Sequence, residues 1–284
     1  MKFGVATFLT DQGIGPAALA EVLEERGFES LFVTEHSHVA ASRRTPFPGG
    51  GELPDKYYRM LDPFLALTAA ATVTSRLVVG TGVALVAQRD PITTAKEVAT
   101  LDLLSNGRLL FGVGIGWNRE EMENHGTDPK TRGKLVDERV EAMQSIWTRE
   151  IFEYHGEFVN LEPSYAWPKP VRHPYPPLYF GGGPAAFPRI ARFGAGWYAV
   201  STSSEDLAES VMQLRAVTGT DTPVTAAHVG PVTAATLRGY ETSGAERVVV
   251  DLETLVETAT LNELDKYVMV AGELGWLPAS TVRR

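Results

Sequence analysis

Residues 77–118 read LVVGTGVALVAQRDPITTAKEVATLDLLSNGRLLFGVGIGWN. Two short runs typical of buried strands, 77–83 and 109–115, flank a segment whose apolar residues recur at helical spacing, which predicts a strand, a helix and a second strand. Both strands run into glycines, which are Gly80, Gly82, Gly112, Gly114 and Gly116. Glycine lets the backbone approach a ligand closely, and parallel α/β proteins bind ligands at the carboxyl ends of their strands. The stretch therefore predicts a ligand near these two strand ends.

Six more segments of the chain have the composition of strands. They are Phe3–Phe8, Ser30–Thr34, Leu178–Phe180, Gly196–Val200, Val224–Val229 and Arg247–Val250. Helical patterns lie between most of them, and eight strands alternating with helices predict an α/β fold, the (β/α)8 TIM barrel, as a single domain over residues 1–284. An open doubly wound sheet is the alternative, but the first strand is not followed by the GxGxxG pattern of a dinucleotide fold.

Two insertions into the barrel are expected. The segment Val39–Met60 is rich in Pro and Gly and has no apolar period, so we predict a mobile lid loop after strand 2. After strand 4, a long helical pattern from Leu135 to Trp147 precedes aromatic and β-branched residues on both sides of Gly156. This pattern predicts a helix followed by a small antiparallel hairpin outside the main sheet.

The composition excludes several classes of function. With 26 basic and 35 acidic residues the formal charge is -9, which disfavours nucleic-acid binding because that affinity comes largely from Lys and Arg neutralising phosphates. The chain has no cysteine, so disulfides, thiolate metal sites and a cysteine nucleophile are excluded. No apolar run reaches the ~18 residues of a membrane span. We expect no membrane association and a cytoplasmic location.

Two groups of residues at strand ends are candidates for chemistry. Gly181, Gly182 and Gly183 separate a strand from a helix, and their N–H groups can hold a phosphate or simply form a tight turn. Glu35 and His36 follow the second strand, where a histidine can exchange protons near neutral pH or serve as an ordinary loop residue. A metal site is not expected, because adjacent strand residues point to opposite faces and no further cluster completes a coordination sphere.

Other residues near the strand ends admit two interpretations each. Asn118 is suited either to hydrogen-bond a planar heterocycle or to cap the acidic helix that follows. The Gly82-Val83 pair either faces the ligand or forms a bulge. Four aromatic residues either line an apolar pocket or pack in the core and the lid. They are Tyr57, Tyr58, Trp117 and Trp167.

Several ordered motifs resemble the luciferase-like superfamily of flavin- and deazaflavin-dependent oxidoreductases over nearly the whole chain. The motifs are TEHSH, GTGV, RDPITTAKEVATLDLLSNGR, GVGIGWNREE, RGKLVDE and PPLYFGGGPAAFPRIARFGAGW. Resemblance to the members that use coenzyme F420, a deazaflavin, implies a non-prolyl cis peptide at Gly82-Val83 against the cofactor ring. It further implies that Asn118 contacts the cofactor, that 181–183 binds its phosphate, and that Glu35 and His36 serve the ring and the substrate.

Two departures limit what the resemblance implies. Glucose-6-phosphate dehydrogenases of this family have an acidic residue after the GxG of strand 4, where this chain has Ile115, so that substrate is not expected. The reactive cysteine of bacterial luciferase is also missing, which disfavours a light-emitting aldehyde monooxygenase.

The leading hypothesis is an F420-dependent oxidoreductase that transfers hydride between the deazaflavin C5 and a small organic substrate, with His36 as acid/base. One alternative is an FMN-dependent monooxygenase supplied with reduced flavin by a separate reductase, and another is a barrel that binds flavin without turnover. An aldolase or isomerase barrel would need a reactive lysine at a strand end, whereas Lys96 and Lys169 fall on a helix and a loop. The resemblance also implies a homodimer.

Overall fold

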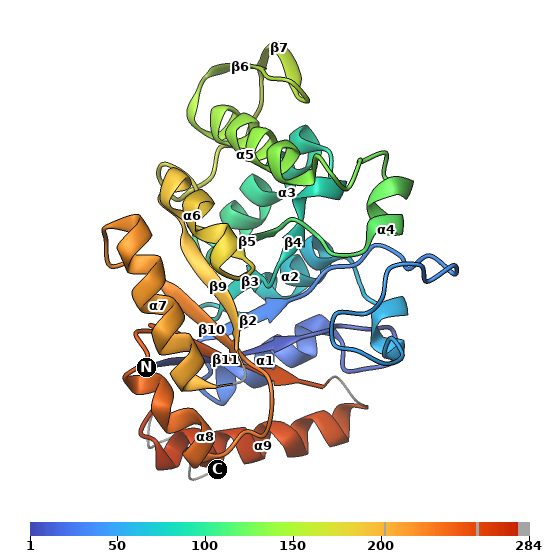
Figure 1. Cartoon of the computed structure of the whole chain (residues 1–284). Helices are drawn as coiled ribbons and strands as arrows, with labels where there is room; N and C mark the ends of the chain where they lie inside the picture. Colours follow the sequence, from blue (N-terminus) through green and yellow to red (C-terminus); the bar gives the residue numbers. More distant parts are fainter. Residues whose placement is uncertain (202, 254–255, 278–284) are drawn as a thin grey trace.

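The computed structural model describes residues 1–201, 203–253 and 256–277, and it contains a closed barrel of parallel strands (Figure 1). The barrel strands are β1 (Lys2–Thr7), β2 (Ser30–Val33), β3 (Val78–Thr81), β5 (Leu109–Gly114), β8 (Leu178–Gly181), β9 (Gly196–Ser201), β10 (Val224–His228) and β11 (Arg247–Leu252). Their order is β3-β2-β1-β11-β10-β9-β8-β5, and pairing of β3 with β5 closes the ring. This arrangement confirms the (β/α)8 barrel predicted from the sequence.

Side chains on both faces of the strands are buried, which explains their nearly continuous apolar sequences. One set packs outward against the helices, as Phe3 and Val5 do from β1. The other set fills the barrel interior and comprises Ala6, Phe32, Leu110, Tyr179, Tyr198, Ala227 and Val249. Because large rings from β2, β8 and β9 occupy this interior, the middle of the barrel is packed and a ligand is confined to its ends.

Helices cover the outside of the barrel. They are α1 (Pro16–Glu25), α2 (Pro63–Thr72), α3 (Pro91–Leu104), α4 (Arg119–Asn124), α5 (Arg132–Thr148), α6 (Phe187–Phe193), α7 (Ser204–Thr218), α8 (Ala234–Arg238) and α9 (Glu257–Glu273). Asp62 and Asp90 cap α2 and α3 by accepting hydrogen bonds from Leu65 and Thr93 N–H groups, and a proline begins each helix. An aspartate followed by a proline is a typical start signal of a helix.

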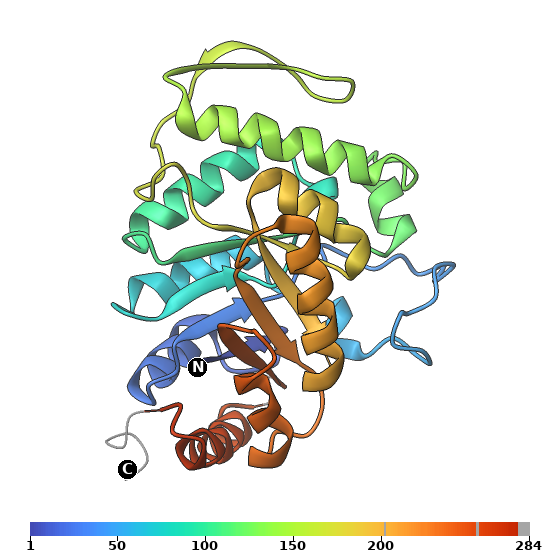
Figure 2. The same cartoon turned by 60° about the vertical axis from the view of Figure 1, so that its left-hand side comes forward.

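Both insertions are present. The hairpin β6 (Ile151–His155) and β7 (Asn160–Tyr165) is antiparallel and lies beyond α5, away from the barrel (Figure 2). The segment after β2 runs beside α4 and contains one 3-10 helix, η1 (Asp55–Tyr58), where the sequence predicted no regular structure (Figure 1).

Some predicted boundaries were wrong. The strand expected over 77–83 is shorter and ends at Thr81 as β3, and an additional two-residue strand, β4 (Ala84–Leu85), follows it before the 3-10 helix η2 (Val86–Gln88). Between β10 and β11, where the sequence has a helical pattern over Thr233–Thr242, α8 ends at Arg238 and is followed by the 3-10 helix η4 (Gly239–Glu241). A further 3-10 turn, η3 (Pro184–Ala186), precedes α6.

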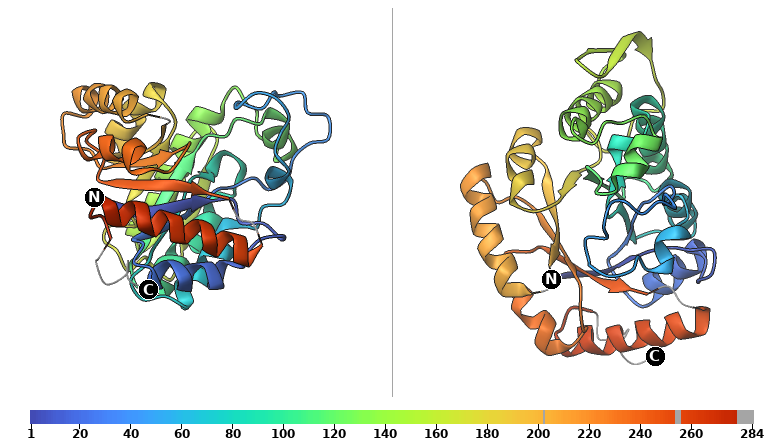
Figure 3. Two further views of the ribbon diagram at one scale, coloured as in Figure 1. Left: turned by 90° about the horizontal axis from the view of Figure 1, so that it is seen from below. Right: turned by 45° about the vertical axis from the view of Figure 1, so that its right-hand side comes forward.

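The helix α9 was not predicted from the sequence, and it lies beside α1 on the outside of the barrel (Figure 3, left). Arg26 Nε donates to Asp265 Oδ1 across this contact at 2.9 Å.

Within the described residues, none of the helices combines the length and the apolar composition that a membrane crossing requires.

Candidate functional site

The barrel topology brings His36 and Trp117 together, although they lie 81 positions apart in the sequence. His36 follows β2 and Trp117 follows β5, and parallel strands end at the same face of the barrel. Trp117 Nε1–H donates to His36 Nε2 at 3.0 Å. Because an indole can only donate, His36 Nε2 carries a lone pair and the ring proton is on Nδ1. His36 Nδ1–H then donates to Glu121 Oε2 at 2.6 Å.

Glu121 is a fully buried carboxylate in the first turn of α4. Its second oxygen, Oε1, accepts from the backbone N–H of Ser37 at 2.8 Å and from the Ser37 hydroxyl at 3.2 Å. Burial alone would raise the pKa of Glu121, but the hydrogen bonds from His36 and Ser37 outweigh it and lower the pKa below its usual value. Glu121 is therefore ionised and paired with the histidine.

Glu121 was not among the site residues predicted from the sequence. The available signal was its position in the motif GWNREE, in the first turn of the helix that directly follows β5. The spacing between residues 36 and 121 gives no hint that the two side chains meet.

Further polar side chains connect this pair to the surface. Ser37 Oγ lies 2.7 Å from His125 Nε2 and 2.9 Å from His38 Nδ1. His38 Nε2 lies 2.8 Å from Asn124 Nδ2. Partial burial and the nearby His38 lower the pKa of His125. A continuous set of exchangeable groups thus leads from the buried His36 to the exposed His125.

Glu35, the other predicted catalytic residue, is held by different partners. Its carboxylate accepts from Leu85 N–H and from Arg89 Nε, both at 2.6 Å. Arg89 also donates to Asp62 at 2.7 Å and to Glu97 at 2.9 Å. These contacts fix the end of β2 to the segment after β4. This cluster and His36 border the same cavity of about 320 Å³, and its walls are Glu35, His36, Ser37, Met60, Asp62, Pro63, Gln88, Arg89 and His125.

The Gly82-Val83 peptide bond is cis, as the resemblance implied. The Val83 side chain packs against the backbone of β5 and β8: a Cβ built at Gly181 would lie 3.1 Å from Val83 Cγ1, and one at Gly112 would lie 3.4 Å from the same atom. A Cβ at Gly82 would lie 2.5 Å from the hydroxyl oxygen of Tyr198. Glycines at these positions therefore leave room for Val83 and Tyr198 at the barrel mouth.

Asn118 is buried and caps α4, where its Oδ1 accepts from Glu121 N–H at 3.4 Å. Of the two interpretations of this residue, helix capping is present in the structure. Contact with a cofactor remains a prediction.

The glycine run lies where β8 ends, on the other side of the mouth from His36. Gly182 has φ +115°, which side chains rarely adopt, and its carbonyl accepts from Trp197 Nε1–H at 2.7 Å. Gly182 and Gly183 are exposed, and no atom lies within 4 Å of a Cβ built at Gly183. They border a cavity of about 410 Å³ whose other walls are Pro184, Trp197, Val200, Asp206, Leu207 and Ser210. Asp206 is the one charged residue among these walls.

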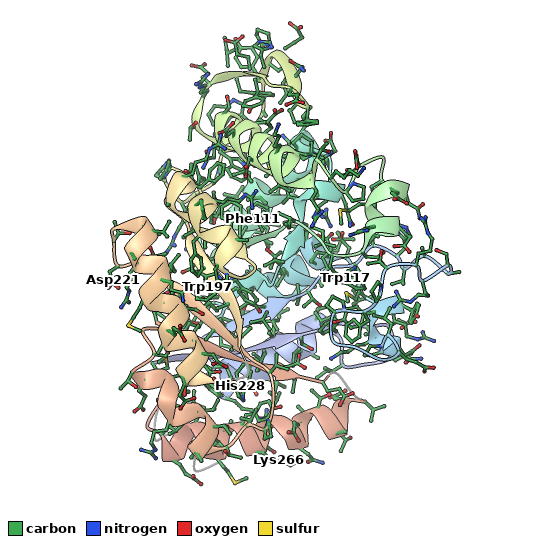
Figure 4. All side chains as sticks on the ribbon, viewed as in Figure 1. Phe111, Trp117, Trp197, Asp221, His228 and Lys266 are labelled. Atoms are coloured by element: carbon green, nitrogen blue, oxygen red, sulfur yellow. The ribbon has the colours of Figure 1, made fainter. Side chains whose placement is uncertain are left out.

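Aromatic rings from the lid pack over His36. The ring centroid of Tyr57 lies 5.5 Å from that of His36 and 5.2 Å from that of Phe47, and Phe47 lies 6.1 Å from Trp117. Figure 4 shows Trp117 below α4, next to the segment after β2. Tyr58 and Trp167 are 50% and 60% exposed, so only Tyr57 and Trp117 of the four predicted aromatic residues join this cluster.

The two lysines are engaged away from the mouth. Lys96 donates to the Trp167 carbonyl, and Lys169 donates to the carbonyls of Ile146 and Arg149 at 2.6 Å each. A Schiff-base mechanism therefore gains no support from either residue. In the described part of the chain, no three His, Asp or Glu side chains are grouped as metal ligands would be.

The fold and the site define a (β/α)8 barrel with a histidine–carboxylate pair at the carboxyl end of its strands. The family model of the luciferase-like monooxygenases matches residues 14–236, and the chain belongs to this family. An uncharacterized protein of Mycobacterium tuberculosis is 46% identical over 202 residues, which are 69% of this chain and 71% of the relative. The FMNH2-dependent dimethylsulfone monooxygenase of Pseudomonas putida is 30% identical over 130 residues, 44% of this chain and 36% of that protein.

Solved structures of an F420-dependent dehydrogenase and of a monooxygenase share the fold. An F420-dependent secondary alcohol dehydrogenase in complex with an F420-acetone adduct has a TM-score of 0.74 and 16% identity, with all of both chains covered. The monooxygenase RslO1 from Streptomyces bottropensis also has a TM-score of 0.74, with 19% identity over 96% of this chain and 98% of its own. At these identities the likeness establishes the fold alone.

Proposed function

We propose that this protein is an F420-dependent oxidoreductase that moves a hydride between the deazaflavin C5 and a small organic substrate. When bound, F420 supplies a two-electron hydride carrier, and the protein supplies binding, orientation and proton transfer. The chain's own residues fit this division of roles at two places, the glycine run and His36.

The observation that carries the choice of F420 is the charge around the glycine run. Backbone of Gly182 and Gly183 is exposed there, and the described residues that line the cavity beside it include Asp206 but no lysine or arginine. A phosphomonoester such as that of FMN carries about −1.5 to −2 charges near pH 7, whereas the phosphodiester of F420 carries one. Since the adjacent carboxylate repels the more highly charged phosphate more strongly, the cradle itself suits a phosphodiester better, provided that the carboxylates of the F420 tail lie away from Asp206.

The residues at the mouth can accept a flat ring. Val83 projects between the glycines of β5 and β8, and its side chain is partly exposed. Val83 and Gly82 would support one face of the ring, residues 181–183 would bind the phosphate, and Asn118 would contact the ring edge.

His36 is suited to move the proton that accompanies a hydride. Its Nε2 carries a lone pair and can take the proton of a substrate hydroxyl, while Glu121 stabilises the imidazolium that forms. Trp117 occupies this nitrogen in the structure, so a substrate oxygen has to displace the indole before it can reach His36.

A second candidate function is supported by the relatives. The Pseudomonas putida enzyme and a flavin-dependent trigonelline monooxygenase of Acinetobacter baylyi, 32% identical over 120 residues, are monooxygenases. In that case FMN would be the cofactor and a separate reductase would supply it reduced. The ordered pair of His36 and Glu121 argues against a barrel that merely stores flavin, because storage needs no proton carrier.

Cofactor titration tests the proposal. Purified protein should quench F420 fluorescence at micromolar concentration and bind FMN more weakly. Micromolar FMN binding without F420 binding would reverse the choice. A screen of alcohols, enones and imines with oxidised and reduced F420 then identifies the substrate class.

The His36→Ala variant tests the acid/base role. It should keep cofactor affinity within a few-fold and lose most turnover, and unchanged turnover would remove His36 from the mechanism.

The homodimer implied by the family resemblance remains a prediction, which analytical ultracentrifugation of the purified protein tests.

A further inference from the structure

The two oxygens of Glu121 have separate partners. Oε1 accepts from the backbone N–H of Ser37, a donor that cannot reverse its role, while Oε2 accepts from His36 Nδ1–H. The side chain of His36 is only 6% exposed and that of Glu121 is 0% exposed, so water cannot easily replace either contact. Which nitrogen of the His36 ring carries the proton therefore depends on residue 121 at Nδ1 and on Trp117 at Nε2.

We propose that Glu121 is a positioning residue for the reaction: its negative charge holds His36 as the Nδ1–H tautomer, so that Nε2 keeps the lone pair that serves as the base once a substrate oxygen has displaced the Trp117 indole. The inference rests on the acid/base role of His36 in the proposed function. Glu121 itself contacts neither the mouth cavity beside Arg89 nor the cavity at the glycine run.

Replacing the carboxylate by an amide should reverse the tautomer. In Glu121→Gln the amide oxygen is required by Ser37 N–H, so the amide NH2 faces His36 Nδ1. His36 Nδ1 must then accept, and the ring proton moves to Nε2. There it meets the indole N–H of Trp117, which is also a donor, so the Trp117 contact is lost and no lone pair faces the mouth.

The neighbouring Glu120 offers a matched control. It lies in the same turn of α4 and is 4% exposed, but its carboxylate accepts from the backbone N–H and hydroxyl of Thr45 in the lid. Glu120→Gln therefore removes a buried charge one residue away, keeps an amide oxygen that accepts from the Thr45 N–H of the lid, and changes no partner of His36. Glu121→Asp keeps the charge and shortens the side chain.

Nitrogen-15 NMR of the imidazole rings tests the tautomer without any ligand. The chain has six histidines, and His36 is assigned as the signal set missing from His36→Asn. We expect Nδ1–H in the wild type, in Glu120→Gln and in Glu121→Asp, and Nε2–H in Glu121→Gln. An Nε2–H ring in the wild type, or an unchanged Nδ1–H ring in folded Glu121→Gln, would overturn the inference.

Kinetics separates positioning from a purely structural role. With F420 and a substrate that the wild type turns over, kcat of Glu121→Gln should fall on the order of 10²-fold or more, as in other sites where an amide enforces the wrong histidine tautomer. KM should change within a few-fold, and Glu121→Asp should recover part of kcat. Equal kcat values for Glu121→Gln and Glu120→Gln, each corrected for folded protein, would contradict the inference. If the wild type does not bind F420, the proposed function fails, whereas the NMR measurement still decides the tautomer.

Discussion

The Val83 side chain packs directly against the backbone of Gly114 in β5, so closely that a Cβ atom at Gly114 would overlap Cγ2 of Val83. Gly112 and Gly181 border the same side chain. Gly114, which was predicted to allow close approach of a ligand, and Gly181 therefore make room first for Val83. A ligand would meet Val83, whose position these glycines determine.

The Gly114→Ala variant should destabilise the fold and weaken cofactor binding. The added methyl group overpacks the contact with Val83, which typically costs about 1–3 kcal/mol, and moves the valine toward the mouth. Thermal unfolding and the F420 titration measure both effects. Gly183→Ala is the control for stability, because no atom lies within 4 Å of its Cβ, and its melting temperature should match the wild type. An unchanged melting temperature in Gly114→Ala would show that the barrel can relax around the valine.

Glu35 should matter more for stability than for catalysis. Both of its oxygens are occupied by Leu85 N–H and Arg89 in a nearly buried position, and hydrogen bonds to charged groups contribute about 1.5–3 kcal/mol each. Urea unfolding of Glu35→Gln should show that the free energy of unfolding is lower than in the wild type by about 1.5–3 kcal/mol. Glu97→Gln, which removes a more exposed partner of the same arginine, should show a smaller loss. A Glu35→Gln protein of normal stability without turnover would instead support the direct catalytic role predicted from the sequence.

The barrel was predictable because each strand has its own local signal. Apolar runs of strand length, glycine or proline at their ends, and caps such as Asp62 and Asp90 are visible in short windows. The site was predictable only in part. His36 stands at a strand end, but its partners Glu121 and Trp117 reach it through the closure of the barrel, which is a long-range property. The contacts of Glu35 with Leu85 and Arg89 could not be predicted from the sequence for the same reason.

The lid should loosen when its contact with α4 is removed. The Thr45 hydroxyl and backbone N–H both bind the buried carboxylate of Glu120, so Thr45→Val deletes one hydrogen bond and leaves that carboxylate underpaired. Trypsin should then cut after Arg43, Arg44 or Lys56 several-fold faster than in the wild type. Glu123→Gln is the control, because it removes only the exposed ion pair with Arg44 and such pairs contribute little. Equal cleavage rates in Thr45→Val and the wild type would show that the aromatic cluster alone holds the lid.

Glu24 should make the stability of the protein depend on pH in the acid range. Partial burial by itself raises the pKa of this carboxyl, but the backbone N–H groups of Arg76, Leu77 and Ser75 donate to it and lower the pKa from 4.5 to about 2. A carboxyl with a lowered pKa in the folded state stabilises the fold fully above its unfolded pKa, and this contribution disappears as pH falls through the folded value. The difference in unfolding free energy between the wild type and Glu24→Gln should therefore be constant above about pH 5 and shrink between pH 4.5 and 2. Urea unfolding at pH 7, 5, 4 and 3 measures it, with Glu25→Gln as the control on the exposed side of the same helix. A difference that stays constant down to pH 3 would mean that the turn at residues 75–77 does not hold an ionised Glu24.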